Sequence, residues 1–316
     1  MSAAEDWGLA LRGSHLATAI DRITEPWSNA IIRAAFLGAR QFEMFQQALD
    51  IPRQTLSLRL RGLVEMGLLR RHQYQTQPVR EEYRLTSLGK DLYGHVLTSW
   101  LWDRLWGDPH RLMPKALVHQ RCGHACTPLL LCPHCNDPLS LNKMQPVLAA
   151  SARPVILRTE RNRRWRKPPT TGGPTLERDI LAVIDDRWSL LLVAAATLGL
   201  SRYDEFAQAL AISSAVLAQR LQRLCLLDVL RRQPDPDDAR RARYLLAPAG
   251  TALFPYLLTL SAWGQALANA PDTIAWVHSP CGQTTRGQVA CSHCRQTLLP
   301  QEVVRPAAPT KAKLND

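Results

Sequence analysis

Cysteine and histidine recur in two short segments with the spacing of metal ligands. LVHQRCGHACTPLLLCPHC occupies residues 117–135, and WVHSPCGQTTRGQVACSHC occupies residues 276–294. Each segment has a His-x-x-Cys pair, then nine residues, then a Cys-x-x-Cys pair. Zn²⁺ takes four S or N ligands in a tetrahedron, and ligand pairs with this spacing are typical of small zinc ribbons. The pattern therefore predicts a closed site with three Cys and one His in each segment.

Comparison of the two segments indicates which residues are the ligands. The positions kept in both are His119, Cys122, Cys132 and Cys135 in the first segment, and His278, Cys281, Cys291 and Cys294 in the second. His124 and Cys126 have no such counterpart, and His134 and His293 each lie between two cysteines. Segments this short bury too little apolar surface to fold alone, so we expect one structural zinc ion in each. The alternatives are a disulfide across each Cys-x-x-Cys pair, or reduced thiols without metal.

The two segments are the ends of a longer tandem repeat. Residues 36–71 align without a gap on residues 197–232, and 14 of these 36 positions are identical. Such a repeat indicates a duplicated unit. The expected division is a winged helix-turn-helix domain over 1–112, a zinc-ribbon-like segment over 113–150, a basic Pro/Gly linker over 151–174, a second winged domain over 175–271, a second ribbon-like segment over 272–305 and a flexible tail over 306–316.

Periodicity within one unit predicts a winged helix-turn-helix. In the first copy, apolar residues have helical spacing over 40–49 and again over 52–67, with a tight turn between them. The sequences LLRRHQ and EEYRLT flank a polar turn, which is the pattern of a β-hairpin. A long apolar helix over 87–106 is expected to close the unit. The fold class is therefore mainly α with small β wings, and it occurs twice.

The outer face of the second helix is suited to reading DNA. Leu56, Leu60 and Leu63 share one face, so Gln54, Ser57, Leu58 and Arg61 fall on the opposite one. In the major groove, Arg and Gln side chains hydrogen-bond to base edges. The chain carries a formal charge of +12, which favours an anionic partner such as nucleic acid.

These marks give the chain a resemblance to a known family. The first copy has Trp27, Gly38, the RQF at 40–42, the run LSLRLRGLVEMGLLRR at 56–71 and the YRLTSLG at 83–89. The segment from Trp27 to Gly89 resembles the HxlR family of bacterial winged-helix regulators, which are relatives of the MarR type. The second copy has the same marks more loosely, with Trp188, Gly199, and Tyr244 to Gly250. The resemblance implies a dimeric DNA-binding transcription factor, so we expect double-stranded DNA as the partner.

The chain departs from the family pattern at two places. Family members often carry a cysteine thirteen residues before the tryptophan, where this chain has Ser14 and Thr175, so a thiol switch at that position is not expected. The reading face of the second copy also differs. Ala215, Ala218, Gln219 and Gln222 replace Gln54, Ser57, Leu58 and Arg61. We therefore expect the second unit to contact DNA more weakly, or to serve partly as a dimer partner within the chain.

The residues expected to contact DNA come from both units. In the first unit we expect Gln54, Ser57 and Arg61 to read bases, and Arg53, Arg59, Arg80 and Arg84 to reach phosphates. In the second we expect Ser214, Gln219, Arg220, Gln222, Arg223, Arg240 and Arg241. The alternative is a protein-interaction module with structural zinc and vestigial DNA binding.

Other classes of function have no support in the sequence. There is no phosphate-binding loop, dinucleotide glycine pattern, HExxH or nucleophile elbow, so an enzyme is not expected. No apolar run is long enough to span a bilayer and the N-terminus lacks a signal peptide, which predicts a cytoplasmic, nucleoid-associated protein. An intramolecular pseudo-dimer, a homodimer and a small apolar effector all stay open.

Overall fold

The computed structural model describes residues 3–107, 116–149, 180–268 and 271–304. The predicted linker over 151–174, the tail over 306–316 and Thr175 lie outside these residues. The described chain is mainly helical, with five small sheets of two or three strands. None of its helices is long and apolar enough to cross a membrane.

The first unit contains the expected helix-turn-helix and wing. Its helices and strands are α1 (Ala3–Gly13), α2 (His15–Ile23), α3 (Pro26–Phe36), α4 (Phe42–Leu49), α5 (Arg53–Glu65), β1 (Leu69–Thr76), β2 (Val79–Leu85), α6 (Ser87–Lys90) and α7 (Tyr93–Trp106). Strands β1 and β2 form the antiparallel wing, in which Leu69 pairs with Leu85. Leu56, Leu60 and Leu63 of α5 are fully buried, as their spacing predicts.

The second unit repeats this order. Its elements are α8 (Leu181–Ile184), α9 (Arg187–Thr197), α10 (Tyr203–Leu210), α11 (Ser214–Leu226), β7 (Leu230–Asp235), β8 (Asp238–Leu246), α12 (Pro248–Thr251) and α13 (Phe254–Leu267). The helix ends are built alike in the two units. Glu25 caps α3 by accepting from the backbone N–H of Ser28, and Asp186 caps α9 by accepting from that of Ser189.

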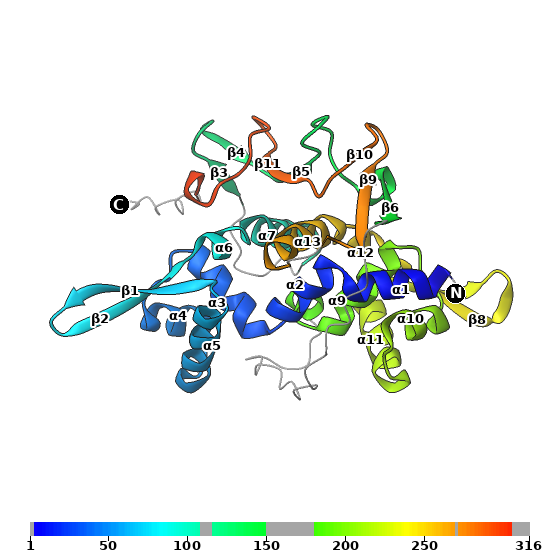
Figure 1. Ribbon diagram of the computed structural model, residues 1–316, viewed down its shortest axis with the longest axis horizontal. Helices are drawn as coiled ribbons and strands as arrows, with labels where there is room; N and C mark the ends of the chain where they lie inside the picture. The colour runs from blue at the N-terminus through cyan, green and yellow to red at the C-terminus, as the bar shows by residue number, and fades with distance from the viewer. Residues whose placement is uncertain (1–2, 108–115, 150–179, 269–270, 305–316) are drawn as a thin grey trace, which may run out of the picture.

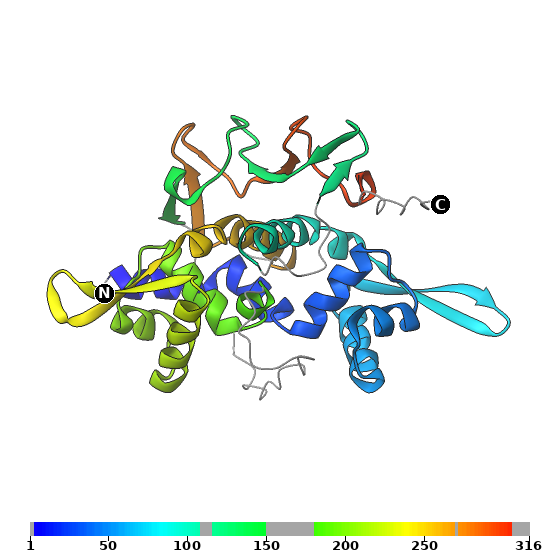
Figure 2. The same ribbon diagram turned by 180° about the vertical axis from the view of Figure 1, so that it is seen from behind.

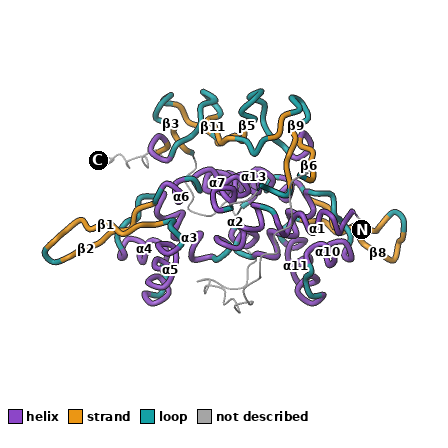
Figure 3. Tube along the Cα trace, in the orientation of Figure 1, coloured by secondary structure: helices purple, strands orange, loops and turns teal. Residues whose placement is uncertain are grey.

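The short strands after each unit form the remaining sheets. They are β3 (Leu117–His119), β4 (His124–Cys126), β5 (Pro128–Leu131) and β6 (Met144–Leu148), with η1 (Leu141–Lys143), and then β9 (Ile274–His278), β10 (Gln283–Thr284), β11 (Gln288–Cys291) and β12 (Val303–Val304), with η2 (Pro300–Glu302). These strands lie together along the upper edge of the molecule in Figure 1, above α7 and α13. The helices occupy the middle and lower layers, as the tube in Figure 3 shows by colour.

Helices α7 and α13 join the two units about an approximate two-fold axis. The indole Nε1–H of Trp102 donates to the carbonyl of Ala249 at 2.8 Å, and that of Trp263 donates to the carbonyl of Leu88 at 3.0 Å. Trp102 corresponds to Trp263 in the repeat, and Leu88 corresponds to Ala249. Each unit therefore donates one of the two equivalent bonds to the other unit. The hydroxyls of Thr98 and Thr259, which are also corresponding residues, lie 3.3 Å apart. The units therefore face each other as two subunits of a symmetric dimer would.

The N-terminal helices of the first unit pack on the second unit. Helix α1 packs against α10 of the second unit, and α2 packs along α13. The side chain of Arg12 donates to the carbonyl of Ala209, and the amide of Gln208 donates to Glu5 at 2.8 Å. The first residues of the chain therefore complete the core of the second unit. The apolar core is correspondingly continuous from α2 and α3 to α9 and α13.

The long helix expected over 87–106 is interrupted. Helix α6 ends at Lys90, and α7 begins at Tyr93 after a turn through Asp91 and Leu92. The break has a local cause, because α6 must lie directly against the end of the recognition helix. A Cβ on Gly89 would lie 2.2 Å from the carbonyl oxygen of Leu68, so only glycine permits this approach. Helix α7 can then run in a different direction, toward α13.

We predict that this close approach limits which residues are tolerated. Gly250 is the counterpart of Gly89, and its added Cβ would lie 2.1 Å from the carbonyl oxygen of Val229. Gly250→Ala should destabilise the protein by about 1–3 kcal/mol, because backbone atoms must move to relieve the clash. Thermal unfolding measures the effect.

Gly62→Ala is the matched control. Gly62 lies inside α5, and a Cβ there meets nothing within 4 Å. Alanine has the higher helix propensity, so this variant should be stabilised by up to about 1 kcal/mol. Equal melting temperatures for Gly250→Ala and the unmodified protein would contradict the tight packing at α12.

Candidate nucleic-acid interface and metal centres

Helix α5 presents a polar outer face to solvent. Arg53, Gln54, Ser57, Leu58 and Arg61 are all exposed. With Phe42 and Thr55, these residues line a broad open hollow at the end of the helix-turn-helix. The guanidinium of Arg53 lies over the ring of Phe42, 4.9 Å from its centroid. The face that the sequence analysis assigned to base reading is therefore free of any covering element in the described structure.

Two arginines that were expected to contact DNA are instead engaged within the fold. The Nε of Arg59 lies 3.0 Å from a carboxylate oxygen of Glu25. Arg220 forms the corresponding ion pair with Asp186. Glu25 and Asp186 are also the caps of α3 and α9, so each arginine ties a recognition helix to the start of the preceding long helix.

The first wing offers basic groups at its tip. Arg80 is exposed and has no ion-pair partner among the residues that the structure describes. Arg71 pairs with Glu81 at 3.6 Å, with both side chains about half exposed. Arg84 pairs with Glu82, which is nearly buried. Of the two wing arginines predicted to contact DNA, Arg80 is thus the one with a free guanidinium.

Helix α11 presents a face of different chemistry. Ser214, Gln219 and Gln222 are exposed, together with the small residues Ala215 and Ala218. The amide oxygen of Gln219 accepts from Arg220 at 2.9 Å. Arg223 is half-buried, and burial lowers its pKa. No arginine is therefore exposed on the outer face of this helix.

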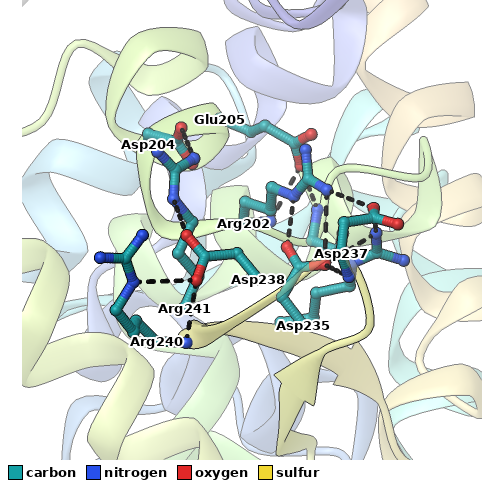
Figure 4. A network of polar contacts seen from close by, with 10 residues as sticks. Arg202, Asp204, Glu205, Asp235, Asp237, Asp238, Arg240 and Arg241 are labelled. Carbon is teal, nitrogen blue, oxygen red and sulfur yellow. Dashed lines mark hydrogen bonds and ion pairs between the residues drawn. The ribbon is translucent and has the colours of Figure 1, made fainter.

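Three arginines of strand β8, and Arg202 at the start of α10, are held by aspartates, as Figure 4 shows. Asp235 has a fully buried side chain that accepts from Arg202 at 2.6 Å and from Arg243 at 3.0 Å. The hydrogen bond from Arg202 holds the pKa of Asp235 at about 2. Nearby, Asp238 pairs with Arg240 at 3.3 Å and with Arg241 at 3.5 Å. Both arginines predicted to contact DNA therefore have an acidic neighbour.

The two recognition helices lie on the same side of the molecule. In Figure 1, α5 and α11 both project from the lower edge, on the side opposite the short strands. The wings β1–β2 and β7–β8 extend outward from the two ends. The view from behind in Figure 2 has the same arrangement. One face of the molecule thus carries two helix-and-wing units.

The cysteines and histidines on the opposite edge form two clusters, but not in the expected pairs. One cluster is His119, Cys122, Cys291 and Cys294, and the other is Cys132, Cys135, His278 and Cys281. All eight predicted ligands are present in them. The expectation that each segment closes its own site is wrong, because each cluster combines the His-x-x-Cys pair of one copy with the Cys-x-x-Cys pair of the other.

Exchange of strands between the copies is the reason for this crossing. Strand β12 of the second copy pairs with β3 of the first, and β6 of the first pairs with β9 of the second. Strands β5 and β11 pair with each other between the two clusters. The expected ribbon within one segment is thus replaced by two composite ribbons, each built from both copies.

The distances within each cluster suit one tetrahedral metal ion. Ligands at zinc distances in a tetrahedron place two sulfurs about 3.8 Å apart, and a sulfur and a nitrogen about 3.5 Å apart. The Sγ atoms of Cys122 and Cys291 are 3.9 Å apart, and those of Cys132 and Cys281 are 3.8 Å apart. The Nδ1 atom of His278 lies 3.4 Å from the Sγ of Cys135 and 3.3 Å from that of Cys281.

The other ring nitrogen of each histidine faces a carboxylate. The Nε2 of His119 lies 3.5 Å from Glu302, and that of His278 lies 3.8 Å from Asp137. Both Nε2 atoms are buried. A carboxylate on the far side of a metal-bound imidazole fixes its orientation and makes it a better ligand. The sequence analysis missed Glu302 and Asp137, because the exchange of strands brings each to a histidine of the other copy.

Backbone amides support ionised thiols at both knuckles. Burial acts to raise the pKa of Cys132, but amides of Cys135 and His134 outweigh it, so this pKa is lowered. Cys291 has the same balance, with amides from Cys294 and His293. The pKa values of Cys122 and Cys135 are raised instead, so the amides favour the thiolate, which is the form that binds metal, at Cys132 and Cys291 only.

The histidines that were not assigned as ligands, His124 and His293, lie close to the cluster that contains Cys122. The rings of His124 and His293 stack at 3.6 Å between centroids, and with Cys122 they form a third group of potential donors. Both rings are exposed. Two imidazoles stacked in parallel direct their in-plane lone pairs alongside each other and not toward one point. We therefore interpret the pair as an aromatic stack between the two copies and not as a pair of metal ligands. Cys126 is buried in the apolar core beneath the ribbons.

Comparison with known proteins places the chain in a family. The model of the HxlR-like helix-turn-helix matches residues 22–111 and again 183–272. An uncharacterised HTH-type transcriptional regulator of Mycobacterium tuberculosis is 36% identical over 148 residues, covering 46% of this chain and 91% of the relative. The HTH-type transcriptional regulator YvaP of Bacillus subtilis is 35% identical over 82 residues, covering 26% of this chain and 76% of that one. These names do not favour the interaction-module alternative.

A solved structure matches as well. The chain in the crystal structure of PA1607 is 33% identical in sequence to this chain. The match covers 40% of this chain and 89% of that one, with a TM-score of 0.37. The two family matches together span more than half of the chain and fall on the two halves of the repeat. The chain therefore belongs to the HxlR-like helix-turn-helix family, with two copies of the family's domain in one polypeptide.

Proposed function

We propose that this protein is a sequence-specific DNA-binding transcriptional regulator in which one chain supplies both DNA-reading units. The observation that carries the proposal is the placement of α5 and α11, with their wings, on one edge of the molecule. A symmetric dimer of single-domain regulators presents two recognition helices in this way to successive major grooves. The packing of α7 against α13 supports the same arrangement within a single chain.

The first unit supplies the main base contacts in this proposal. Gln54, Ser57 and Arg61 lie exposed on the outer face of α5, and Arg53 and Arg80 are free to approach phosphates. Arg59 and Arg220 are assigned a different task from the one their position first suggested. Their ion pairs with Glu25 and Asp186 fix how each recognition helix leaves the core. From the second unit, Ser214, Gln219 and Gln222 face DNA.

We further propose that each composite ribbon holds one structural zinc ion. Three thiolates and one imidazole are a donor set that zinc prefers, and four protein ligands close the site. The ion would supply no chemistry beyond holding its ligands together. Since each ribbon contains strands of both copies, the two ions would also fasten one half of the chain to the other.

The remaining assignments follow from this role. A DNA-binding regulator of this family acts in the cytoplasm, at the nucleoid. The partly open pocket among α1, α9 and α13 has a volume of only about 20 Å³, which holds about one water molecule, so we assign no effector to it.

We predict that Arg61→Ala weakens binding to an operator selected from random DNA. Loss of an arginine that contacts a base edge costs about 1–3 kcal/mol and relaxes the preference at that base pair. Fluorescence anisotropy at fixed salt, on the selected operator and on single-base variants of it, measures both effects.

Arg121→Ala removes the same charge at the opposite edge of the molecule. Arg121 is exposed in the turn between β3 and β4. Its affinity for the operator should stay close to that of the unmodified protein. If both variants lose affinity equally, the contribution of Arg61 is only its charge, and base reading by Arg61 is refuted.

We also predict that paired cysteine variants will reveal the crossed ligand sets. Cys122→Ser with Cys294→Ser removes two ligands from one cluster, so one site of full zinc affinity should remain. Cys122→Ser with Cys132→Ser removes one ligand from each cluster, so no site of full affinity should remain. Titration against a chromogenic chelator counts the tight sites in each protein.

The unmodified protein should have two tight sites and is the reference for both variants. Closure of each ribbon within its own copy would reverse the outcome, because Cys122 and Cys132 would then share one ion. That reversal would refute the crossed arrangement, and no tight site in the unmodified protein would refute the zinc proposal.

A further inference from the structure

We infer that the operator has two unlike half-sites, one read at guanine by α5 and one read at adenine by α11, so that the chain binds it in a single orientation. This inference rests on the proposed function. It goes beyond it by assigning a base preference to each unit. A regulator formed by two identical subunits is restricted to related half-sites, and this chain is not.

The outer faces of the two recognition helices differ at every exposed position that the repeat aligns. In the order of the helix, the pairs are Arg53 with Ser214, Gln54 with Ala215, Ser57 with Ala218, Leu58 with Gln219 and Arg61 with Gln222. By contrast, the buried Leu56, Leu60 and Leu63 recur as Leu217, Leu221 and Leu224. The helices are therefore seated on their cores in the same way while presenting different groups.

The central difference is that between Arg61 and Gln222. A guanidinium donates two hydrogen bonds to the O6 and N7 of guanine, whereas a carboxamide donates to N7 and accepts from the N6 amino group of adenine. Arg61 is exposed and has no ion-pair partner in the described part of the chain. Gln222 is likewise exposed. Equivalent placement in the groove thus leads to opposite purines in the two half-sites.

Within α11, no arginine takes the place of Arg61 on the outer face. Arg220 is engaged with Asp186, and Arg223 is half-buried against the core. In the second wing, Arg243 shares the buried Asp235 with Arg202 of α10, whereas Arg231 and Arg232 are exposed at the base of β7. The part of α11 that can enter a groove is therefore limited to carboxamide, hydroxyl and methyl groups.

The second unit should also make weaker contacts to phosphate than the first. Arg80 at the tip of the first wing is free, whereas Arg240 and Arg241 of the second wing both pair with Asp238. The adenine half-site should therefore contribute less to the affinity than the guanine half-site. One chain can still contact both half-sites, because the packing of α7 on α13 holds α5 and α11 on the same edge of the molecule.

The test begins with selection of operators from random DNA by the full-length protein. The expected motif has a conserved G·C pair in one half and a conserved A·T pair at the mirror-related position in the other. Two symmetrised operators are then made, one with two guanine halves and one with two adenine halves. Each should bind at least about five-fold more weakly than the selected operator, the loss typical of one wrong base pair.

Exchange of the two side chains links each half-site to its helix. Gln222→Arg should shift the preferred base in the adenine half to guanine and make the operator with two guanine halves the better ligand. Gln145→Arg adds the same charge on β6, at the edge away from α11, and should leave the base preference unchanged. Arg61→Gln should favour the operator with two adenine halves.

The possible outcomes distinguish failure of this inference from failure of the proposed function on which it rests. A palindromic motif with the same purine in both halves, or a motif confined to one half, would overturn the inference while leaving a sequence-specific regulator. Failure to enrich any motif would overturn the proposed function itself. A base preference that Gln222→Arg leaves unchanged would show that α11 does not read this position.

Discussion

Each four-donor cluster takes two of its donors from each copy of the repeat, and the arrangement of the whole molecule depends on this sharing. The short strands of one copy have few backbone partners of their own. They find them in the other copy, where β12 pairs with β3 and β6 pairs with β9. A segment of this size has little apolar surface to bury, so ligand clusters and exchanged strands must supply its order. Neither half of the chain is a complete structure without the other.

The helical layer makes the same connection by different forces. Reciprocal hydrogen bonds from Trp102 and Trp263 cross between the units, and both indoles are buried, so losing either bond would leave a polar group without a partner. Helix α2 packs along α13, close enough that a Cβ on Gly264 would lie 2.1 Å from the carbonyl of His15. The recognition helices are thus attached to a single apolar core. Their relative placement follows from that core, as DNA reading at a fixed spacing requires.

The sequence predicts local structure well and the connections between distant segments poorly. Period and turn residues are local signals, and they lead correctly to α4, α5, the wing and the repeat. The ligand spacing identifies all eight donors. It says nothing of which copy completes which site, since the pattern is the same whether a ribbon closes on itself or exchanges strands. The ion pairs of Arg59 and Arg220 were missed for a similar reason, because Glu25 and Asp186 are far from them in the chain.

Fusion of two units in one polypeptide has a consequence that two separate subunits would not allow. In a homodimer, every change on one recognition helix appears on the other, so the two half-sites must change together. Here the buried leucines of α5 and α11 have stayed alike while the exposed faces have diverged. The divergence extends to the supporting helices, because Gly264 of α13 corresponds to Asp103 of α7. The chain thus combines one shared core with two recognition helices whose exposed residues can change independently.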